Sequence, residues 1–287
     1  MQHKPLHIYW FSGSGNTLKA VESFAARLRE LGGAVELHAL EKSDPERIDP
    51  DAAFGLAFPT HCFSIPEIVR AFVKRLPTTE GTPAMMLGTH GAFSGGVCGP
   101  MKRILRKKGF RCVAGRIFIM PDSFFPYTGE KFNRFITERA LKNVAKYAEL
   151  YYKLEDKNKT SWSYWPVLSD ICGLVLGTVF ASRKLSHSFH TTVYVAKNKC
   201  TRCGICVKLC PTSAIQPDKD GFPTANINCV NCLRCVAVCQ HDAMKHVLGF
   251  HSYRIDPAAE LCKTLYRFSC GEKADFVPDQ IDVHQHK

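Results

Sequence analysis

Most of the cysteines in this chain fall in two short runs that share one spacing. Both runs read C-x-x-C-x-x-C-x-x-x-C, and the second begins at Cys229, 29 positions after Cys200. This is the bacterial iron–sulfur spacing, in which three close cysteines hold one cubane cluster and the fourth crosses to the other. The sequence therefore predicts two 4Fe–4S clusters.

The same rule assigns every cysteine of the two runs to a cluster. The first cluster takes Cys200, Cys203, Cys206 and Cys239. The second cluster takes Cys210, Cys229, Cys232 and Cys235. Amides of the short loops are expected to point at the sulfurs. Pro211 suits the first position of a short helix that the fourth cysteine opens.

Zinc sites and disulfide bonds are the other common uses of clustered cysteines. A zinc site usually splits two C-x-x-C pairs across a longer spacer. A disulfide framework suits a small secreted chain, whereas this chain has 287 residues and no leader peptide is expected. The repeated run therefore favours iron–sulfur ligation in a cytoplasmic, anaerobic setting. Ordinary core or surface thiols are expected elsewhere, at Cys98, Cys112, Cys172, Cys262 and Cys270.

A loop rich in glycine and hydroxyl groups follows the apolar run 6–11, which reads as a buried strand. Its residues are Ser12, Gly13, Ser14, Gly15, Asn16 and Thr17. The segment after it has helical periodicity, and amides at a helix N-terminus bind anions. No lysine follows the glycines as in a Walker loop, and Leu18 replaces the third glycine of a dinucleotide motif.

The composition of this loop instead suits a single terminal phosphate. It resembles the phosphate loop of flavodoxins, which hold FMN in this way. An ordinary turn between a strand and a helix is the alternative.

Strand-like and helical segments alternate through the first half of the chain. The expected strands are 6–11, 34–38, 54–58, 84–88 and 116–120. This alternation indicates an α/β fold, a flavodoxin-like doubly wound parallel five-stranded sheet. Ligands bind beyond the carboxyl ends of such strands, so the loops after the third and fourth strands are expected to border the flavin ring.

These loops supply the remaining candidate FMN-binding residues. After the third strand they are Pro59, Thr60, His61, Cys62 and Phe63. After the fourth they are Thr89, His90, Gly91, Ala92, Phe93, Gly95 and Gly96. Phe93 is a candidate stacking ring. His61 and His90 are alternatively loop histidines without proton chemistry, and Cys62 is either redox-active or a small buried thiol.

Three segments are expected along the chain. Residues 1–158 form the FMN-binding domain, 159–190 an interdomain linker, and 191–287 a small α+β ferredoxin domain with a tail. The linker contains an apolar stretch, 164–181, that barely reaches membrane-spanning length. We expect it to pack between the domains, and membrane contact with Arg183 and Lys184 as anchors is the alternative.

The chain as a whole resembles the fused flavodoxin–ferredoxin family. The loop 11–17, the eight cysteines and the segment 251–257 carry the resemblance. It implies an N-terminal FMN domain joined to a two-cluster, bacterial-type ferredoxin. Two features depart from the family: Gln240 stands where proline usually follows the last cysteine, and the loop 60–63 is less aromatic.

These expectations lead to an electron relay between the clusters and FMN, because clusters pass single electrons and a flavin accepts one or two. One alternative is an FMN-dependent oxidoreductase that reduces a small molecule, and another is a redox-sensing binding module. The formal charge of +12 is only partly offset by cofactor charge and favours an acidic redox partner such as a ferredoxin or flavodoxin. No nucleic-acid-binding module is recognised.

Overall fold

A computed structural model of the chain describes residues 4–61, 64–91, 97–123, 129–156, 159–162 and 193–247. The chain divides into two compact units, the first drawn mainly from residues 1–181 and the second mainly from 182–287. The apolar stretch 164–181 and the segment 251–257 lie outside the described residues. Within the described ranges, no helix is long and apolar enough to cross a membrane.

The first unit is built on a parallel sheet with the strand order β2-β1-β3-β4-β5-β6. The strands are β1 (Leu6–Trp10), β2 (Val35–Ala39), β3 (Ala53–Pro59), β4 (Pro83–His90), β5 (Arg111–Ile119) and β6 (Ser161–Trp162). The order of the first five strands is that of the flavodoxin-like doubly wound fold. The predicted fold class is therefore confirmed.

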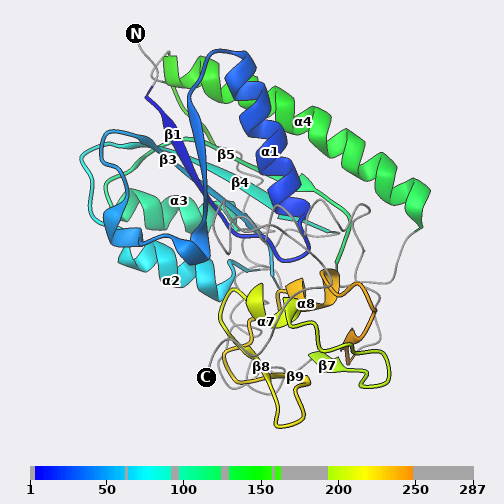
Figure 1. Ribbon diagram of the computed structural model, residues 1–287. Coiled ribbons are helices and arrows are strands. Elements are labelled where there is room, and N and C mark those ends of the chain that lie inside the picture. Colours follow the sequence, from blue (N-terminus) through cyan, green and yellow to red (C-terminus); the bar gives the residue numbers. More distant parts are fainter. Residues whose placement is uncertain are drawn as a thin grey trace. The chain divides into compact units, whose positions relative to one another are not determined.

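Helices cover both faces of this sheet (Figure 1). They are α1 (Asn16–Glu30), α2 (Glu67–Arg75), α3 (Cys98–Lys107) and α4 (Glu130–Asp156), with short 3-10 turns η1 (Leu40–Lys42) and η2 (Pro45–Arg47). Figure 1 shows α1 and α4 together on one face and α2 and α3 on the other. The central strands β3 and β4 are buried along almost their whole length, as expected for strands covered on both faces.

The two-residue strand β6 extends the sheet beyond the five strands that the sequence predicts. Gly115 in β5 makes room for it, because a Cβ at this position would lie 2.4 Å from Cε2 of the Trp162 ring. The Trp162 indole also donates a hydrogen bond to the carbonyl oxygen of Cys98, at 3.1 Å. A strand of this length is too short to show alternation in the sequence, so the prediction assigned it to the linker.

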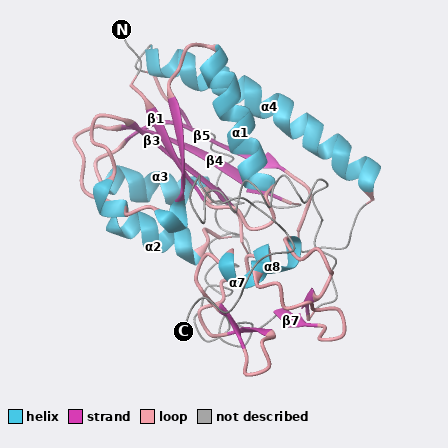
Figure 2. Ribbon diagram, in the orientation of Figure 1, coloured by secondary structure: helices cyan, strands magenta, loops and turns pink. Residues whose placement is uncertain are grey.

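The second unit is a small α+β structure, also as predicted (Figure 2). Its elements are β7 (Val193–Val195), α7 (Ile205–Lys208), β8 (Ile215–Pro217), β9 (Pro223–Ala225), α8 (Arg234–Ala237) and β10 (Met244–His246). The strands form two antiparallel pairs, β7 with β10 and β8 with β9. Its core combines aliphatic side chains such as Ile215 and Met244 with the buried Cys206 and Cys235.

Candidate functional site

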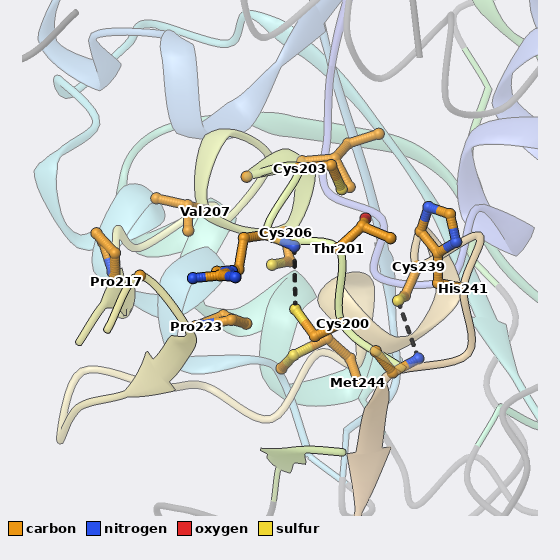
Figure 3. A pocket seen from close by; sticks show the side chains of 15 residues that line it. Cys200, Thr201, Cys203, Cys206, Val207, Pro217, Pro223, Cys239, His241 and Met244 are labelled. Carbon is orange, nitrogen blue, oxygen red and sulfur yellow. Dashed lines mark hydrogen bonds between the residues drawn. The ribbon is translucent and has the colours of Figure 1, made fainter. Parts of the chain in front are cut away.

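The eight cysteines of the two runs gather around two separate hollows in the second unit. One hollow is lined by Cys200, Cys203, Cys206 and Cys239, as Figure 3 shows. The other is lined by Cys210, Cys229, Cys232 and Cys235. The fourth cysteine of each run thus lies with the first three of the other run, which is the arrangement that the spacing predicts.

The backbone repeats between the two runs as closely as the sequence does. Residues 29 positions apart adopt the same left-handed conformation, in the pairs Arg202 and Asn231, Gly204 and Leu233, and Ser213 and Asp242. The φ angles of the last pair are 52° and 51°. The short helices α7 and α8 also begin 29 positions apart. Because non-glycine residues rarely adopt positive φ, this shared geometry identifies a loop shape that both runs need.

Backbone amides point at the cysteine sulfurs. The amides of Ala214 and Ala243 each donate a hydrogen bond of 3.2 Å, to Sγ of Cys210 and of Cys239 respectively. The amide of Arg202 donates to Sγ of Cys200 at 3.4 Å. Figure 3 marks the bonds to Cys200 and Cys239. Such bonds stabilise negative charge on ligand thiolates and tune the potential of a cluster.

The turn after the fourth cysteine differs from the sequence prediction. The sequence predicts a helix with Pro211 in its first turn, but residues 211–213 form a turn instead. The amide of Ser213 donates a hydrogen bond to the carbonyl oxygen of Cys210. Ser213 has a positive φ, so the backbone leaves the helical conformation at this residue. The second run forms the same turn with Gln240 in place of proline, so this departure from the family does not alter the loop geometry.

The sulfurs are spaced too widely to share one zinc ion. Zn–S bonds of about 2.3 Å in tetrahedral geometry place thiolates roughly 3.8 Å apart. Among the described residues, no three cysteine sulfurs lie within 4.8 Å of one another. Burial also raises the pKa of the Cys206 thiol to about 12, and a coordinating cation is what deprotonates such a thiol. The site therefore fits a multi-iron cluster and not a mononuclear metal.

A second candidate site lies where β1, β3 and β4 end in the first unit. In the loop after β1, Gly15 has a φ of 97°, and the amide of Leu18 donates to Oγ of Ser12 at 3.4 Å. This turn opens α1 at Asn16. The loop therefore presents its glycines and hydroxyls at a helix N-terminus, where an anion is stabilised.

Side chains of the phosphate-type loop are tied to neighbouring strand ends. The hydroxyl oxygens of Thr17 and Thr89 lie 2.7 Å apart, and both residues are buried. Asn16 Nδ2 donates to the carbonyl oxygen of Pro121 at 2.8 Å, and Ser14 bonds to Ser123. Thr89, which we expected beside the flavin ring, thus supports the phosphate-type loop.

The contribution of the segment 121–123 was missed by the sequence prediction. It follows β5, so it reaches the same edge of the sheet as the other three loops. Its Pro-Asp-Ser sequence is typical of a turn, and this signal could have indicated a loop at the same edge of the sheet.

The loop after β3 is joined to the end of β4 by the amide of Thr60, which donates to the carbonyl oxygen of Thr89 at 2.7 Å. His61 and Ser64 exchange backbone hydrogen bonds, and the His61 ring packs edge-on against Phe11 with centroids 5.9 Å apart. Burial lowers the pKa of His61 to about 4. Oγ1 of Thr60 is buried and has no hydrogen-bond partner among the described residues. This hydroxyl could therefore form a hydrogen bond with a ligand.

The structure thus brings together the loops that the sequence assigns to FMN. Pro59, Thr60, His61, Thr89, His90 and Gly91 lie at the ends of β3 and β4, on the carboxyl edge of the sheet. Cys62, Phe63, Ala92, Phe93, Gly95 and Gly96 lie outside the described residues. The hydroxyl-rich loop at the start of α1 is compatible with a phosphorylated flavin.

Comparison with known proteins identifies residues 199–244 as a 4Fe-4S dicluster domain. No curated protein sequence matches the chain. Among solved structures, a flavodoxin of Streptococcus pneumoniae TIGR4 is 18% identical, with 52% of this chain and 97% of that chain covered and a TM-score of 0.42. Flavodoxin 2 of Bacillus cereus is 17% identical, with 52% and 98% covered and a TM-score of 0.42. The flavodoxin of Megasphaera elsdenii is 21% identical, with 48% and 98% covered and a TM-score of 0.35.

The fold class rests on the strand order of the first unit rather than on these similarities. The matched domain and that strand order define the chain as a flavodoxin-like α/β unit joined to a ferredoxin-type 4Fe–4S domain. The predicted combination of the two is therefore confirmed.

Proposed function

We propose that this protein is an electron-transfer flavo-iron–sulfur protein that holds two 4Fe–4S clusters and FMN. The observation that carries the proposal is the division of eight cysteines into two groups of four, with the fourth cysteine of each run exchanged. A cluster supplies one-electron transfer and FMN supplies one- or two-electron transfer. The protein would relay electrons between these cofactors and an external redox partner.

The residues of the second unit have distinct roles in this proposal. The four cysteines around each hollow would ligate one cluster, and the amides of Arg202, Ala214 and Ala243 would stabilise the charge on its sulfurs. The residues with positive φ in each run would curve the loop so that its cysteine sulfurs surround one cluster. Burial of Cys206 and Cys235 among aliphatic side chains limits the access of water to the clusters.

At the start of α1, the loop 12–17 would hold the FMN phosphate through backbone amides and the hydroxyls of Ser12 and Ser14. Thr17 and Asn16 fix the loop through their bonds to Thr89 and Pro121. Thr60 offers a hydroxyl that has no hydrogen-bond partner within the described ranges of the chain. Depression of the His61 pKa keeps that imidazole neutral at physiological pH, so it would contribute no charge to the flavin.

The proposed partner is an acidic redox protein, in a cytoplasmic and anaerobic setting. The formal charge of +12 exceeds the charge that two clusters and one FMN phosphate would remove, roughly −2 each. The loaded protein would remain positive and would attract an acidic ferredoxin or flavodoxin. This proposal predicts that electron exchange slows as the ionic strength rises.

The cofactor content is tested by purifying the full chain without oxygen and measuring iron, sulfide and flavin. We expect about eight iron atoms and eight sulfides per chain, with one FMN. Cys203→Ser and Cys232→Ser should each remove the signal of one cluster in electron paramagnetic resonance. The matched control is Cys112→Ser, because Cys112 is buried in the first unit, outside both runs. Full iron content in both run variants would refute the assignment.

Electron flow is tested in the same variants by stopped-flow reduction of the flavin with a reduced ferredoxin. Flavin reduction should be slowed in both run variants and unchanged in Cys112→Ser. If the flavin is reduced at the normal rate in both run variants, the relay is wrong. Steady turnover of a quinone or a nitro compound by the wild type would instead favour an FMN-dependent oxidoreductase.

A further inference from the structure

Three side chains with metal-binding atoms meet on one face of the first two strands. His7 in β1 pairs with Glu36 in β2, and His38 lies two residues further along β2. Side chains two positions apart on a strand point to the same face. Glu36 and His38 therefore project together, and the parallel register places His7 beside them. Leu6, Ile8 and Trp10 point to the opposite face and are buried.

The distances between the ligand atoms match a small coordination shell. Oε2 of Glu36 lies 3.6 Å from Nε2 of His7 and 3.4 Å from Nε2 of His38. The ligand atoms of all three residues lie within 4.8 Å of one another. Zinc bonds to nitrogen and oxygen of about 2.0–2.2 Å in tetrahedral geometry place neighbouring ligand atoms roughly 3.3–3.6 Å apart. Two of the distances between ligand atoms in this cluster thus already match tetrahedral zinc geometry.

Packing holds the two imidazoles in this position. The ring of Tyr9 stacks on the ring of His38 with centroids 5.1 Å apart and an angle of 24° between the planes. The rings of His7 and His38 also lie with centroids 5.1 Å apart. Nε2 of His38 is buried, and Oε2 of Glu36 lies 3.4 Å from it without meeting hydrogen-bond geometry. A metal ion between these two atoms would coordinate both.

We propose that His7, Glu36 and His38 bind one zinc ion, with water as the fourth ligand. Zinc accepts two imidazoles and one carboxylate as protein ligands, and its fourth coordination position is then open to water. The side chain of Glu36 is 62% exposed, so its side of the cluster is open to water. The ion would tie the edge strand β2 to β1. This site does not depend on the iron–sulfur clusters or on FMN.

The simpler explanation of the cluster is that Glu36 acts as a counterion to a protonated imidazole. That explanation requires no metal and predicts no zinc binding at these residues. Zinc itself is therefore the probe, and the test compares the purified wild-type chain with Glu36→Gln. The matched control is Glu46→Gln, which alters an exposed carboxylate of the same unit that pairs with Arg75 at 3.0 Å.

Zinc bound per chain is measured by equilibrium dialysis followed by atomic emission. Cysteines and other histidines contribute equally in all three proteins, so differences isolate the proposed site. We expect Glu36→Gln to bind one zinc ion fewer per chain, or to bind that ion at least ten-fold more weakly, and Glu46→Gln to match the wild type. Equal zinc content and affinity in Glu36→Gln and the wild type would overturn the proposal.

A second measurement locates the ion on particular residues. Diethyl pyrocarbonate modifies accessible imidazoles, and peptide mass spectrometry shows which histidines react. Zinc should protect His7 and His38 in the wild type but not in Glu36→Gln, and the exposed His241 serves as the internal reference. Absence of protection at His7 and His38 in the wild type would also refute the site.

Discussion

Arg234 occupies the position in the second cysteine run that Ile205 occupies in the first. The two residues lie 29 positions apart, each opening the short helix of its run, and both are buried. Nη1 of Arg234 donates to the carbonyl oxygen of Leu209 at 3.1 Å. Burial raises the pKa of the neighbouring Cys232 to about 11, and the charge of Arg234 opposes that rise. The two cysteine groups therefore share a backbone but differ in electrostatic environment.

Because of this difference, the cluster held by Cys210, Cys229, Cys232 and Cys235 should have the higher reduction potential. Reduction adds negative charge, which a permanent nearby cation stabilises. Arg234→Ile should lower that potential by an amount on the order of 1–2 kcal/mol, or about 40–90 mV for a one-electron couple. An anaerobic redox titration followed by electron paramagnetic resonance measures it. Arg234→Lys keeps the charge and should stay near the wild-type potential, and an unchanged potential in Arg234→Ile would disprove the effect.

Gly204 adopts its φ of 71° without the strain that Leu233, with a φ of 58°, bears at the equivalent position of the second run. Gly204→Ala should destabilise the cluster-loaded second unit by about 1–2 kcal/mol, because a Cβ is strained in the left-handed region. Thermal loss of cluster absorbance measures the change. Ser213→Ala is the control, since Ser213 is already a non-glycine residue with a φ of 52° and its replacement should be close to neutral. Equal stability of the two variants would contradict the argument from strain.

The contact between Gly115 and Trp162 should limit which residues β5 accepts. A Cβ at Gly115 would lie 2.4 Å from the indole ring, so Gly115→Ala should cost about 1–3 kcal/mol through overpacking. Denaturant unfolding followed by tryptophan fluorescence measures the loss. In a double-mutant cycle with Trp162→Ala, the cost of the alanine should largely disappear. A cost that persists without the indole would show that the strain lies elsewhere.

His61 should make the stability of the first unit depend on pH. Its pKa of about 4 in the folded state is below the ordinary value of about 6.5 in the unfolded chain. The unfolded state therefore binds the proton more readily, and stability is full above about pH 6.5 and falls as pH drops toward 4. Between pH 7.5 and 5.0 the loss should be about 2 kcal/mol.

This pH effect is checked by denaturant unfolding of the wild type and of His61→Asn at both pH values. The asparagine variant has no group that titrates here, so its loss over this range should be about 2 kcal/mol smaller. The same loss in both proteins would assign the pH effect to other groups.

Local sequence patterns predicted the elements of this protein well. The repeated cysteine spacing indicated both the cluster domain and the exchange of the fourth cysteines, because loop length fixes which sulfurs can reach one cube. Alternating strands and helices indicated the α/β unit, because hydrophobic periodicity reports the local secondary structure. The turn at Pro211 was mispredicted because a proline after cysteine fits a helix start and a turn equally well.

Only the tertiary structure decided which of these elements became neighbours. The bond between Thr17 and Thr89 and the docking of Trp162 on Gly115 join residues far apart in the chain. The cluster of His7 with Glu36 and His38 depends on the parallel register of β1 and β2. Pairing between parallel strands is set by how the helices pack the whole sheet together, and no short stretch of sequence encodes that packing.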